Sequence, residues 1–538
     1  MTTQELLNRR RFLARCTGHA LGVSAMSALG DLRLMGAALP STLSDYKALI
    51  CIFLNGGHDA GNFIVPRSGQ SFDDYVSQRG GLMNYDALTA GTTGGLALPL
   101  DRIQRANGNV NQLPYSVPIA LDENPYGFDF GLNAYAANLK SSVVGGVVQS
   151  DDGTPQTGGI KTLWDEGKVA CLANVGTLVE PINRTKYKNG QGKRPPQLYS
   201  HNDQVYQWQT SIPDQPSRTG WAGRMADLLS QAPYNAVGDT TNKVSISISL
   251  SGTNTIEVGD IVAQYQLTTS GAVALTAAST ASRRQAILDV LRQPGRTNYH
   301  ERDFADVADR AISNAALITD ALSAAETGAG GFVPGTTPPP GGSAVAFPNT
   351  GLGNQMKMIA RLINATRPNH PNRLASGSSF LQHRRQIYFC SIGGFDTHLG
   401  QPRGQIGLHT EMSNAIYAFV RSMEAMGVSE KVASFTISDF GRTFKNNALG
   451  ANAGSDHGWG SHHFIFGGGV RGRRIFGQFP SLLINGPDDT SDGRWIPTTS
   501  VDEYSATLAK WFGVPTGDLY NIFPNLHKFP STDLGFMA

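Results

Sequence analysis

The chain has 538 residues, enough for three or four domains of about 150 residues or for one large α/β domain with insertions. Its 44 Lys and Arg residues nearly balance its 42 Asp and Glu residues, and this formal net charge of +2 argues against a nucleic-acid-binding protein, which usually carries a strong basic field. A hydrophobic content of 40 % excludes wholesale disorder, and after residue 40 no run of about 18 apolar residues predicts a membrane span.

The amino-terminal segment has the features of an export signal. Residues 8–14, NRRRFLA, resemble the twin-arginine motif, and the mild apolar stretch 20–29 is too short to span a membrane. We expect residues 1–40 to be a twin-arginine signal peptide recognised by the twin-arginine translocase. The mature protein would then be periplasmic or secreted, with no stable membrane span after cleavage. The alternative is an ordinary basic amphipathic helix.

Five apolar segments predict strands. Residues 47–54 form a continuous apolar run that ends at Asn-Gly-Gly, which is typical of a strand buried on both faces of a parallel sheet. Residues 244–250 alternate apolar side chains with Ser and predict a half-exposed edge strand. Further buried strands are expected at 168–173, 386–392 and 432–437.

Three segments between these strands have helical periodicity. Residues 282–326 predict a helical region interrupted at Pro294-Gly295, residues 355–365 a second helix, and residues 408–426 a long helix that ends at Gly427. Strands that alternate with helices predict an α/β fold with a central, mainly parallel sheet covered by helices on both faces.

Three cysteines fall within the predicted strands. Cys51, Cys171 and Cys390 each lie in an apolar run, and none has the C-x-x-C spacing of a metal or redox motif. We therefore expect them to be buried free thiols.

Carboxylates follow three of the predicted strands. Asp59 ends the segment LNGGHD after the first, Asp396 and His398 follow the fourth, and Asp439 follows the fifth. Ligands of open α/β sheets bind at the carboxyl ends of the strands, and carboxylates that meet there repel one another unless protons or cations lie between them. This placement favours a metal site. The alternatives are that Asp59 and Asp439 cap helices and that His398 lies in a surface loop.

The segment SDHGWGSHH, residues 455–463, is the richest in histidine. We expect His457 to be a ligand and at most one of His462 and His463, because neighbours on a strand point to opposite faces. His and Asp together suit zinc, manganese or iron, whereas an all-oxygen set suits calcium or magnesium. No site role is expected for His58, His383 or His409.

A set of motifs in a fixed order resembles a known family. The motifs are LNGGHDAGNFIVP (54–66), LWDEGKVACLANVG (163–176), FDTH (395–398), SDFGRT (438–443), SDHGWG (455–460) and IPTTSVDEYSATLAKWFGVP (496–515). Together they resemble a bacterial family of exported proteins of unknown function, DUF1501-type, placed in the alkaline phosphatase and sulfatase superfamily. The resemblance implies a single alkaline-phosphatase-like α/β domain over 41–538, with insertions near 65–160 and 255–350.

The resemblance also implies a site with two divalent metal ions about 4 Å apart, of zinc, manganese or calcium. Asp59 and Asp439 resemble ligands of one metal, Asp396 and His398 the ligand pair of the other, and His457 the late histidine. Ser200 occupies the place of the nucleophile, and a helix N-cap is its alternative role. His201 would be a partner of a ligand or a substrate contact. Arg442 would either bind an anionic ester or pair with a carboxylate.

Two departures from the superfamily pattern bear on the reaction. Phe440 stands where phosphatases often have His, and no Cys/Ser-x-Pro-x-Arg segment of a standard sulfatase occurs. The resemblance implies an exported metal-dependent hydrolase of phosphate, sulfate or related esters, acting on an anionic small-molecule or polymer ester. The alternative is a non-catalytic exported binding or assembly protein of the envelope or extracellular polymer that retains the fold.

Overall fold

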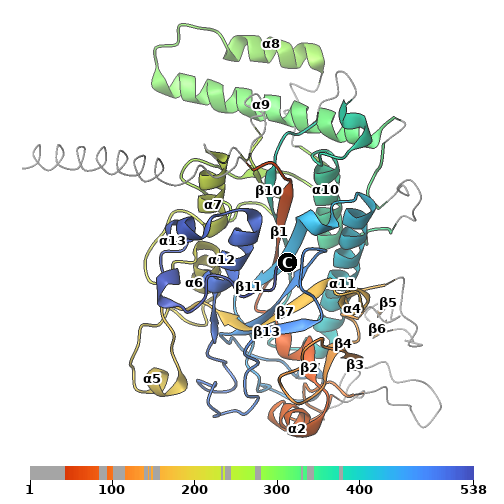
Figure 1. Ribbon diagram of the computed structural model, residues 1–538, viewed down its shortest axis with the longest axis vertical. Helices are drawn as coiled ribbons and strands as arrows, with labels where there is room; N and C mark the ends of the chain where they lie inside the picture. The colour runs from red at the N-terminus through yellow and green to blue at the C-terminus, as the bar shows by residue number, and fades with distance from the viewer. Residues whose placement is uncertain are drawn as a thin grey trace, which may run out of the picture.

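A nine-stranded sheet forms the centre of the computed structural model (Figure 1). The structure describes residues 43–83, 94–100, 115–137, 143–144, 147–148, 158–231, 234, 236, 244–272, 280–328, 331–335, 345–374 and 380–538. The strands are β1 (Lys47–Asn55), β7 (Val169–Gly176), β8 (Ser247–Ser249), β9 (Tyr265–Gln266), β10 (Arg385–Gly393), β11 (Val432–Ser438), β12 (Ser461–Phe466), β13 (Arg474–Gly477) and β14 (Thr499–Ser500). Their order is β13-β7-β12-β11-β1-β10-β8-β9, and β14 pairs with β7.

The sheet is mainly parallel, as predicted. β1 pairs in parallel with β10 on one side and β11 on the other, and β10, β8 and β9 continue in parallel. β12 is antiparallel to both β11 and β7, so one strand of opposite direction lies inside the sheet.

Both faces of β1 are buried, which explains its unbroken apolar sequence. Ala48, Ile50, Ile52 and Leu54 pack into one hydrophobic core, whereas Leu49, Cys51 and Phe53 pack into a second core on the opposite face. Cys51, Cys171 and Cys390 are buried free thiols, as predicted.

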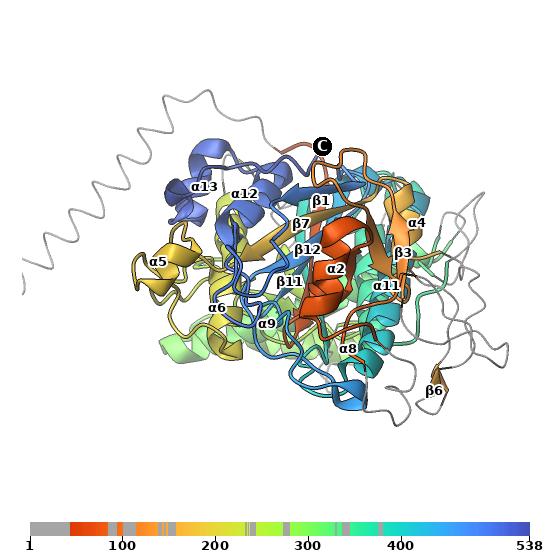
Figure 2. The same cartoon turned by 90° about the horizontal axis from the view of Figure 1, so that it is seen from below.

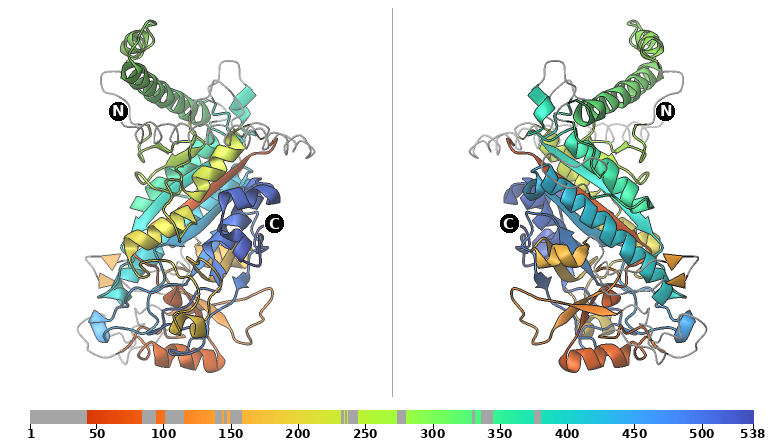
Figure 3. Two further views of the ribbon diagram at one scale, coloured as in Figure 1. Left: turned by 90° about the vertical axis from the view of Figure 1, so that its left-hand side faces the viewer. Right: turned by 90° about the vertical axis from the view of Figure 1, so that its right-hand side faces the viewer.

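Helices cover both faces. The first core contains side chains of α10 (Gly351–Asn364) and α11 (Gln401–Ala425), and the second contains side chains of α7 (Trp221–Ser230) and α12 (Val501–Phe512). Figure 3 shows α10 and α11 on one side of the sheet and the blue carboxyl-terminal helices on the other. The remaining helices are α2 (Gly69–Gln78), α4 (Ile160–Asp165), α5 (Arg184–Lys188), α6 (His201–Thr210), α8 (Ala281–Leu291), α9 (Tyr299–Glu326) and α13 (Leu519–Ile522).

Smaller elements lie at the two ends of the sheet. α8 and α9 form a hairpin at one end, which confirms the predicted break at Pro294-Gly295. At the other end, α2 lies in front of the strand ends when the molecule is seen from below (Figure 2). A three-stranded sheet is formed by β2 (Ile64–Pro66), β4 (Phe130–Asn133) and β3 (Ser116–Ile119), and a two-stranded one by β5 (Val143–Val144) and β6 (Val147–Val148).

Two sequence-based expectations have a different outcome. The prediction of a half-exposed edge strand at 244–250 is wrong, because β9 pairs beyond β8 and the three residues of β8 are buried. The expected signal peptide, residues 1–40, lies outside the described residues. Within the described ranges, the helices are too short or too polar to cross a membrane.

Candidate metal centre

The loops that follow β1, β10 and β11 meet at one edge of the sheet. The register brings them together, because Leu54 of β1 lies opposite both Ile392 of β10 and Ser438 of β11. The polar residues after these three strands therefore share one end of the sheet, as the sequence predicts.

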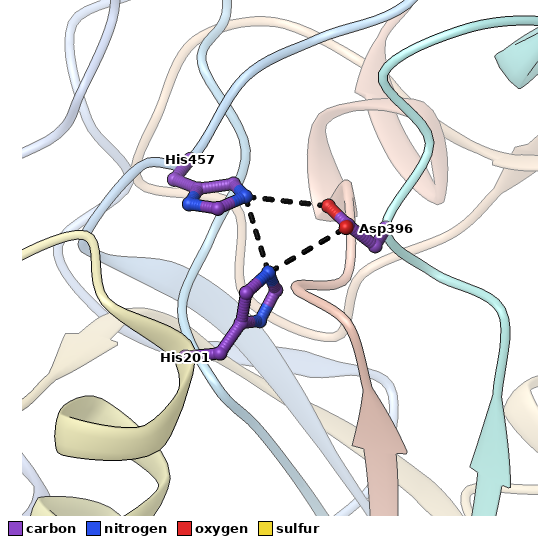
Figure 4. A group of neighbouring side chains, drawn as sticks. All are labelled: His201, Asp396 and His457. Carbon is purple, nitrogen blue, oxygen red and sulfur yellow. Dashed lines mark hydrogen bonds and ion pairs between the residues drawn. The ribbon is translucent and has the colours of Figure 1, made fainter.

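Four side chains converge there, which we call the His–Asp cluster: His201, Asp396, His398 and His457. His457 Nε2 lies 3.1 Å from His201 Nε2 and 2.9 Å from His398 Nε2. Asp396 Oδ1 lies 3.0 Å from His398 Nε2 and 3.3 Å from His457 Nε2, and Asp396 Oδ2 lies 3.6 Å from His201 Nε2. Figure 4 shows His201, Asp396 and His457 pointing at one another from three separate segments.

The opposite ring nitrogen of each histidine faces a hydrogen-bond acceptor. His457 Nδ1 donates to the carbonyl oxygen of Tyr199 at 2.7 Å. His201 Nδ1 lies 2.6 Å from Asp439 Oδ2, and His398 Nδ1 lies 2.9 Å from Asp456 Oδ1. An Nδ1–H that donates to such an acceptor fixes the neutral tautomer in which Nε2 carries a lone pair.

The Nε2 nitrogens of His201 and His457 and the Asp396 carboxylate therefore face one small volume, and His398 Nε2 lies beside His457 and Asp396 at its border. Lone pairs of ring nitrogens about 3 Å apart repel unless a positive charge lies between them. Metal-binding histidines in proteins have this arrangement, with the second ring nitrogen held by a carboxylate or a backbone carbonyl. The donor set of the His–Asp cluster fits a divalent cation.

Burial and neighbouring charge favour the metal-binding protonation states of His457 and Asp396. Partial burial lowers the pKa of His457 below its ordinary value, although the hydrogen bond to Tyr199 acts in the opposite direction. Burial alone would raise the pKa of Asp396, but the hydrogen bond and charge of Arg442 outweigh it, and the net pKa is lowered. Asp396 is thus a carboxylate and His457 a neutral imidazole near pH 7.

Asp439 lies one layer behind the cluster. Its side chain is 1 % exposed, one oxygen bonds His201, and the other accepts the backbone N–H of Gly56 at 2.9 Å. The resemblance implies a direct ligand of a second metal, whereas the structure places Asp439 as the partner that orients His201. No helix begins in the described residues that directly follow Asp439, so the alternative that it caps a helix does not apply.

Asp59 is not part of the cluster. It precedes the short 3-10 helix η1 (Ala60–Asn62) without a side-chain cap bond, and its Oδ2 lies 2.5 Å from Nη2 of buried Arg79. The side-chain amide of Gln401 donates to the same oxygen. An arginine therefore neutralises the carboxylate that the resemblance assigns to a metal.

Arg442 pairs with a carboxylate, which was one of its two expected roles. Its buried guanidinium donates to Asp396 Oδ1 at 2.6 Å, to the carbonyl of Gly56 at 3.1 Å and to the carbonyl of Ser455. These contacts hold Asp396 in its position beside the histidines.

Ser200 occupies the N-cap position of α6 but makes no side-chain cap bond. Its hydroxyl instead donates to Asp203 Oδ2 at 2.5 Å. The next residue is His201, so Ser200 directly precedes a member of the cluster.

Other histidines lie away from the cluster. His462 and His463 are buried in β12, where His462 Nδ1 accepts the backbone N–H of Asn174 and His463 packs on Trp208. His58, His383 and His409 are buried as well. Among the described residues, His201, Asp396 and His457 form a group whose ligand atoms lie within 4.8 Å of one another.

Part of the chain matches a known protein family. Residues 364–507 match the family model described as Protein of unknown function (DUF1501). This match supports the assignment to a family of unknown function. The matched DUF1501 segment contains Asp396, His398 and His457, whereas His201 lies outside it.

Other comparisons add little. No curated protein matches the chain. One solved structure, described as a crystal structure of Ps i-CgsB in complex with k-i-k-neocarrahexaose, aligns over 68 % of this chain and 69 % of that chain, with 8 % identity and a TM-score of 0.26. A likeness this weak carries no argument about fold or function.

Proposed function

We propose that the protein is an exported, metal-dependent hydrolase of phosphate, sulfate or related esters, with an alkaline-phosphatase-like fold and a site that holds one divalent cation. The observation that carries the proposal is the convergence of the Nε2 nitrogens of His201 and His457 and the Asp396 carboxylate, with His398 Nε2 beside them and each histidine held through Nδ1. The superfamily resemblance implies two metals, but the ion pair between Asp59 and Arg79 leaves one set of free donors.

The donor set favours zinc or manganese. Three imidazoles and one carboxylate suit these ions, whereas calcium prefers oxygen ligands throughout. A cation bound there would polarise an ester oxygen and stabilise the negative charge that develops in hydrolysis.

The chain leaves this site open to a substrate. The side chains of Asp396 and His398 are 46 % and 42 % exposed, while that of Asp439 behind them is 1 % exposed. The donors therefore face solvent on one side and buried supporting groups on the other, which is the arrangement that a hydrolytic site requires.

Ser200 is the nucleophile in this proposal. Its hydroxyl donates to the Asp203 carboxylate, which is positioned to accept the proton as Ser200 Oγ attacks the ester. The amino terminus of α6, where Ser200 lies, also favours an anionic group. Arg442 positions Asp396.

Metal analysis and a substrate screen test the proposal. The purified protein should bind one equivalent of zinc or manganese and hydrolyse at least one of the aryl phosphates, phosphodiesters or aryl sulfates. Chelation should abolish turnover, and added metal should restore it. One bound metal without turnover of any ester would favour the second candidate, a non-catalytic exported binding or assembly protein.

Ser200→Ala tests whether the attacking group is the Ser200 hydroxyl or a water molecule. With metal content unchanged, loss of turnover by at least about 100-fold supports Ser200, because its hydroxyl makes no helix-cap bond whose loss could mimic the effect. Full activity would show that Ser200 is not the attacking group.

A further inference from the structure

One surface segment concentrates positive charge beside the candidate site. We define the basic segment as residues 184–194, RTKYKNGQGKR, which contains five Lys or Arg residues and no Asp or Glu. It forms α5 and the loop that follows. Because the whole chain has a net charge of only +2, the rest of the chain is net negative.

The basic side chains point into solvent without counter-charges. Lys186, Lys188, Lys193 and Arg194 are exposed, and none of them forms an ion pair with a described residue. The nearby carboxylate of Glu180 bonds the backbone N–H of Lys193 and leaves its ammonium group free. Like charges this close in sequence repel, so a bound polyanion would relieve the repulsion.

A chain of direct contacts joins the basic segment to the cluster. The hydroxyl of Tyr187, within α5, lies 3.2 Å from the hydroxyl of Tyr199. The carbonyl of Tyr199 in turn accepts the hydrogen bond from His457 Nδ1, and the chain enters the cluster two residues later at His201. Figures 1 and 2 show α5 standing out from the body near the start of α6.

The basic segment offers positively charged groups, whereas the two tyrosine rings in and beside it are already in contact with arginines. The guanidinium of Arg194 lies 5.0 Å from the ring centroid of Tyr187, and that of Arg494 lies 5.2 Å from the ring centroid of Tyr199. Single-stranded nucleic acids are usually bound by aromatic rings on which bases stack, and each of these rings already has a guanidinium over one face. Lysine ammonium groups suit the separate, anionic ester groups of a charged polysaccharide.

We infer that the substrate is an anionic polysaccharide carrying sulfate or phosphate esters, and that the basic segment binds its charged groups beside the ester that is cleaved. The cleavage rests on the proposed function, whereas the binding rests on the charge pattern and stands without it.

A charge-neutralised variant tests the inference. The segment variant carries Lys186→Gln, Lys188→Gln, Lys193→Gln and Arg194→Gln. The control variant loses the same charge on the α8–α9 hairpin, at the far end of the molecule (Figure 1), through Arg283→Gln, Arg284→Gln, Arg302→Gln and Arg310→Gln. Binding of the full chain to dextran sulfate is measured over a series of NaCl concentrations.

The segment variant should bind dextran sulfate at least tenfold more weakly than the wild type at about 0.1 M NaCl. The slope of log Kd against log salt should fall by about 3, because four contacts each contribute about 0.7–0.9. The control variant should bind as the wild type does and should hydrolyse a small aryl ester within about twofold of the wild-type kcat/KM.

Several results would overturn the inference: equal binding by the segment variant and the control variant, tighter segment-dependent binding of single-stranded DNA of matched charge, or segment-dependent binding of phosphatidylglycerol vesicles without binding of dextran sulfate. Segment-dependent binding of dextran sulfate with no hydrolysis of any ester would overturn the proposed function and leave the polyanion site standing. Hydrolysis of small esters, together with polymer binding that does not depend on the segment, would overturn the polyanion site and leave the proposed function standing.

Discussion

Asp59 and Asp396 each lie next to an arginine, but the two pairs have different consequences for metal binding. Asp59 is buried, and its carboxylate accepts hydrogen bonds from both Arg79 and Gln401. Arg442 bonds only Oδ1 of Asp396, whose other oxygen faces His201 and whose side chain is 46 % exposed. The Asp59 carboxylate is thus fully paired inside the protein, whereas the Asp396 carboxylate stays available to a cation.

A variant within the His–Asp cluster and a variant of the buried Asp59–Arg79 pair should therefore behave in opposite ways. His457→Ala should lower metal affinity by at least about 100-fold, because its Nε2 contacts two other donors of the cluster. Asp59→Asn should retain the metal but lose about 3–5 kcal/mol of stability, because the Arg79 charge is left buried without its partner. Metal content after dialysis and urea unfolding measure the two effects. Loss of metal in a folded Asp59→Asn protein would restore Asp59 as a ligand.

The partner of His201 should matter almost as much as a ligand. In Asp439→Asn the amide has one acceptor oxygen where the carboxylate has two, so either His201 Nδ1–H or the Gly56 N–H loses its acceptor. We expect metal affinity to fall about 10–100-fold with the fold retained. Asp165→Asn, which changes an exposed carboxylate paired with Lys161 on α4, is the control for titration with zinc. Unchanged affinity in Asp439→Asn would contradict the orienting role.

A buried carboxyl outside the site should make stability depend on pH. Burial raises the pKa of Glu257 to about 8, against the weaker opposing effect of the hydrogen bond from Asn254. The folded chain therefore binds a proton that the unfolded chain releases above pH 4.5, so stability falls as pH rises from 4.5 to about 8. Glu257→Gln should reduce this slope by up to about 1.4 kcal/mol per pH unit in urea unfolding. An unchanged slope would show that Glu257 is not the group responsible.

The residues of the His–Asp cluster differ in how far the sequence reveals them. Asp396 and His398 directly follow a strand, and His457 lies in a His-rich segment, so local patterns point to all three. His201 joins them only because α6 places its first residue at the strand ends, and Arg79 reaches Asp59 from the end of α2. Such contacts depend on tertiary packing that short sequence patterns do not encode.

At the level of elements, the turn after β1 holds the turn after β10 in place. Gly56 has φ +117°, and a Cβ there would lie 2.4 Å from the backbone nitrogen of Asp396. Gly56→Ala should therefore displace the 395–396 backbone and lower metal affinity. Gly393→Ala is the matched control, because its Cβ would meet no atom within 4 Å. Zinc titration of both variants checks this, and equal affinities would show that the close approach does not position the cluster.

The long elements were predictable and the short ones were not. Strands and helices that are buried on the central sheet, such as β1, β10 and α11, carry continuous or periodic apolar sequence over seven or more residues. β12 contains His462 and His463, and β13 and β14 span four and two residues. Polar or very short strands have no pattern that distinguishes them from loops, because their pairing partners determine them.

For the whole molecule, the three buried thiols can report whether the central sheet unfolds in a single step. Cys51, Cys171 and Cys390 lie in β1, β7 and β10, and burial raises the pKa of each thiol. In a Cys16→Ser background a thiol reagent should label none of them in the native protein. All three should become reactive in the same urea range in which circular dichroism reports unfolding, and labelling of one thiol before the transition would show that its part of the sheet opens separately.

The position of β1 has a consequence for biosynthesis. β1 begins at Lys47, yet its neighbours in the sheet begin at Arg385 and Val432. A ribosome adds about 5–20 residues per second, so the most apolar strand emerges roughly 20–70 s before the first strand that can pair with it. During that interval both of its edges and both of its faces are open to other nascent chains. Slower translation therefore lengthens the period in which aggregation competes with folding.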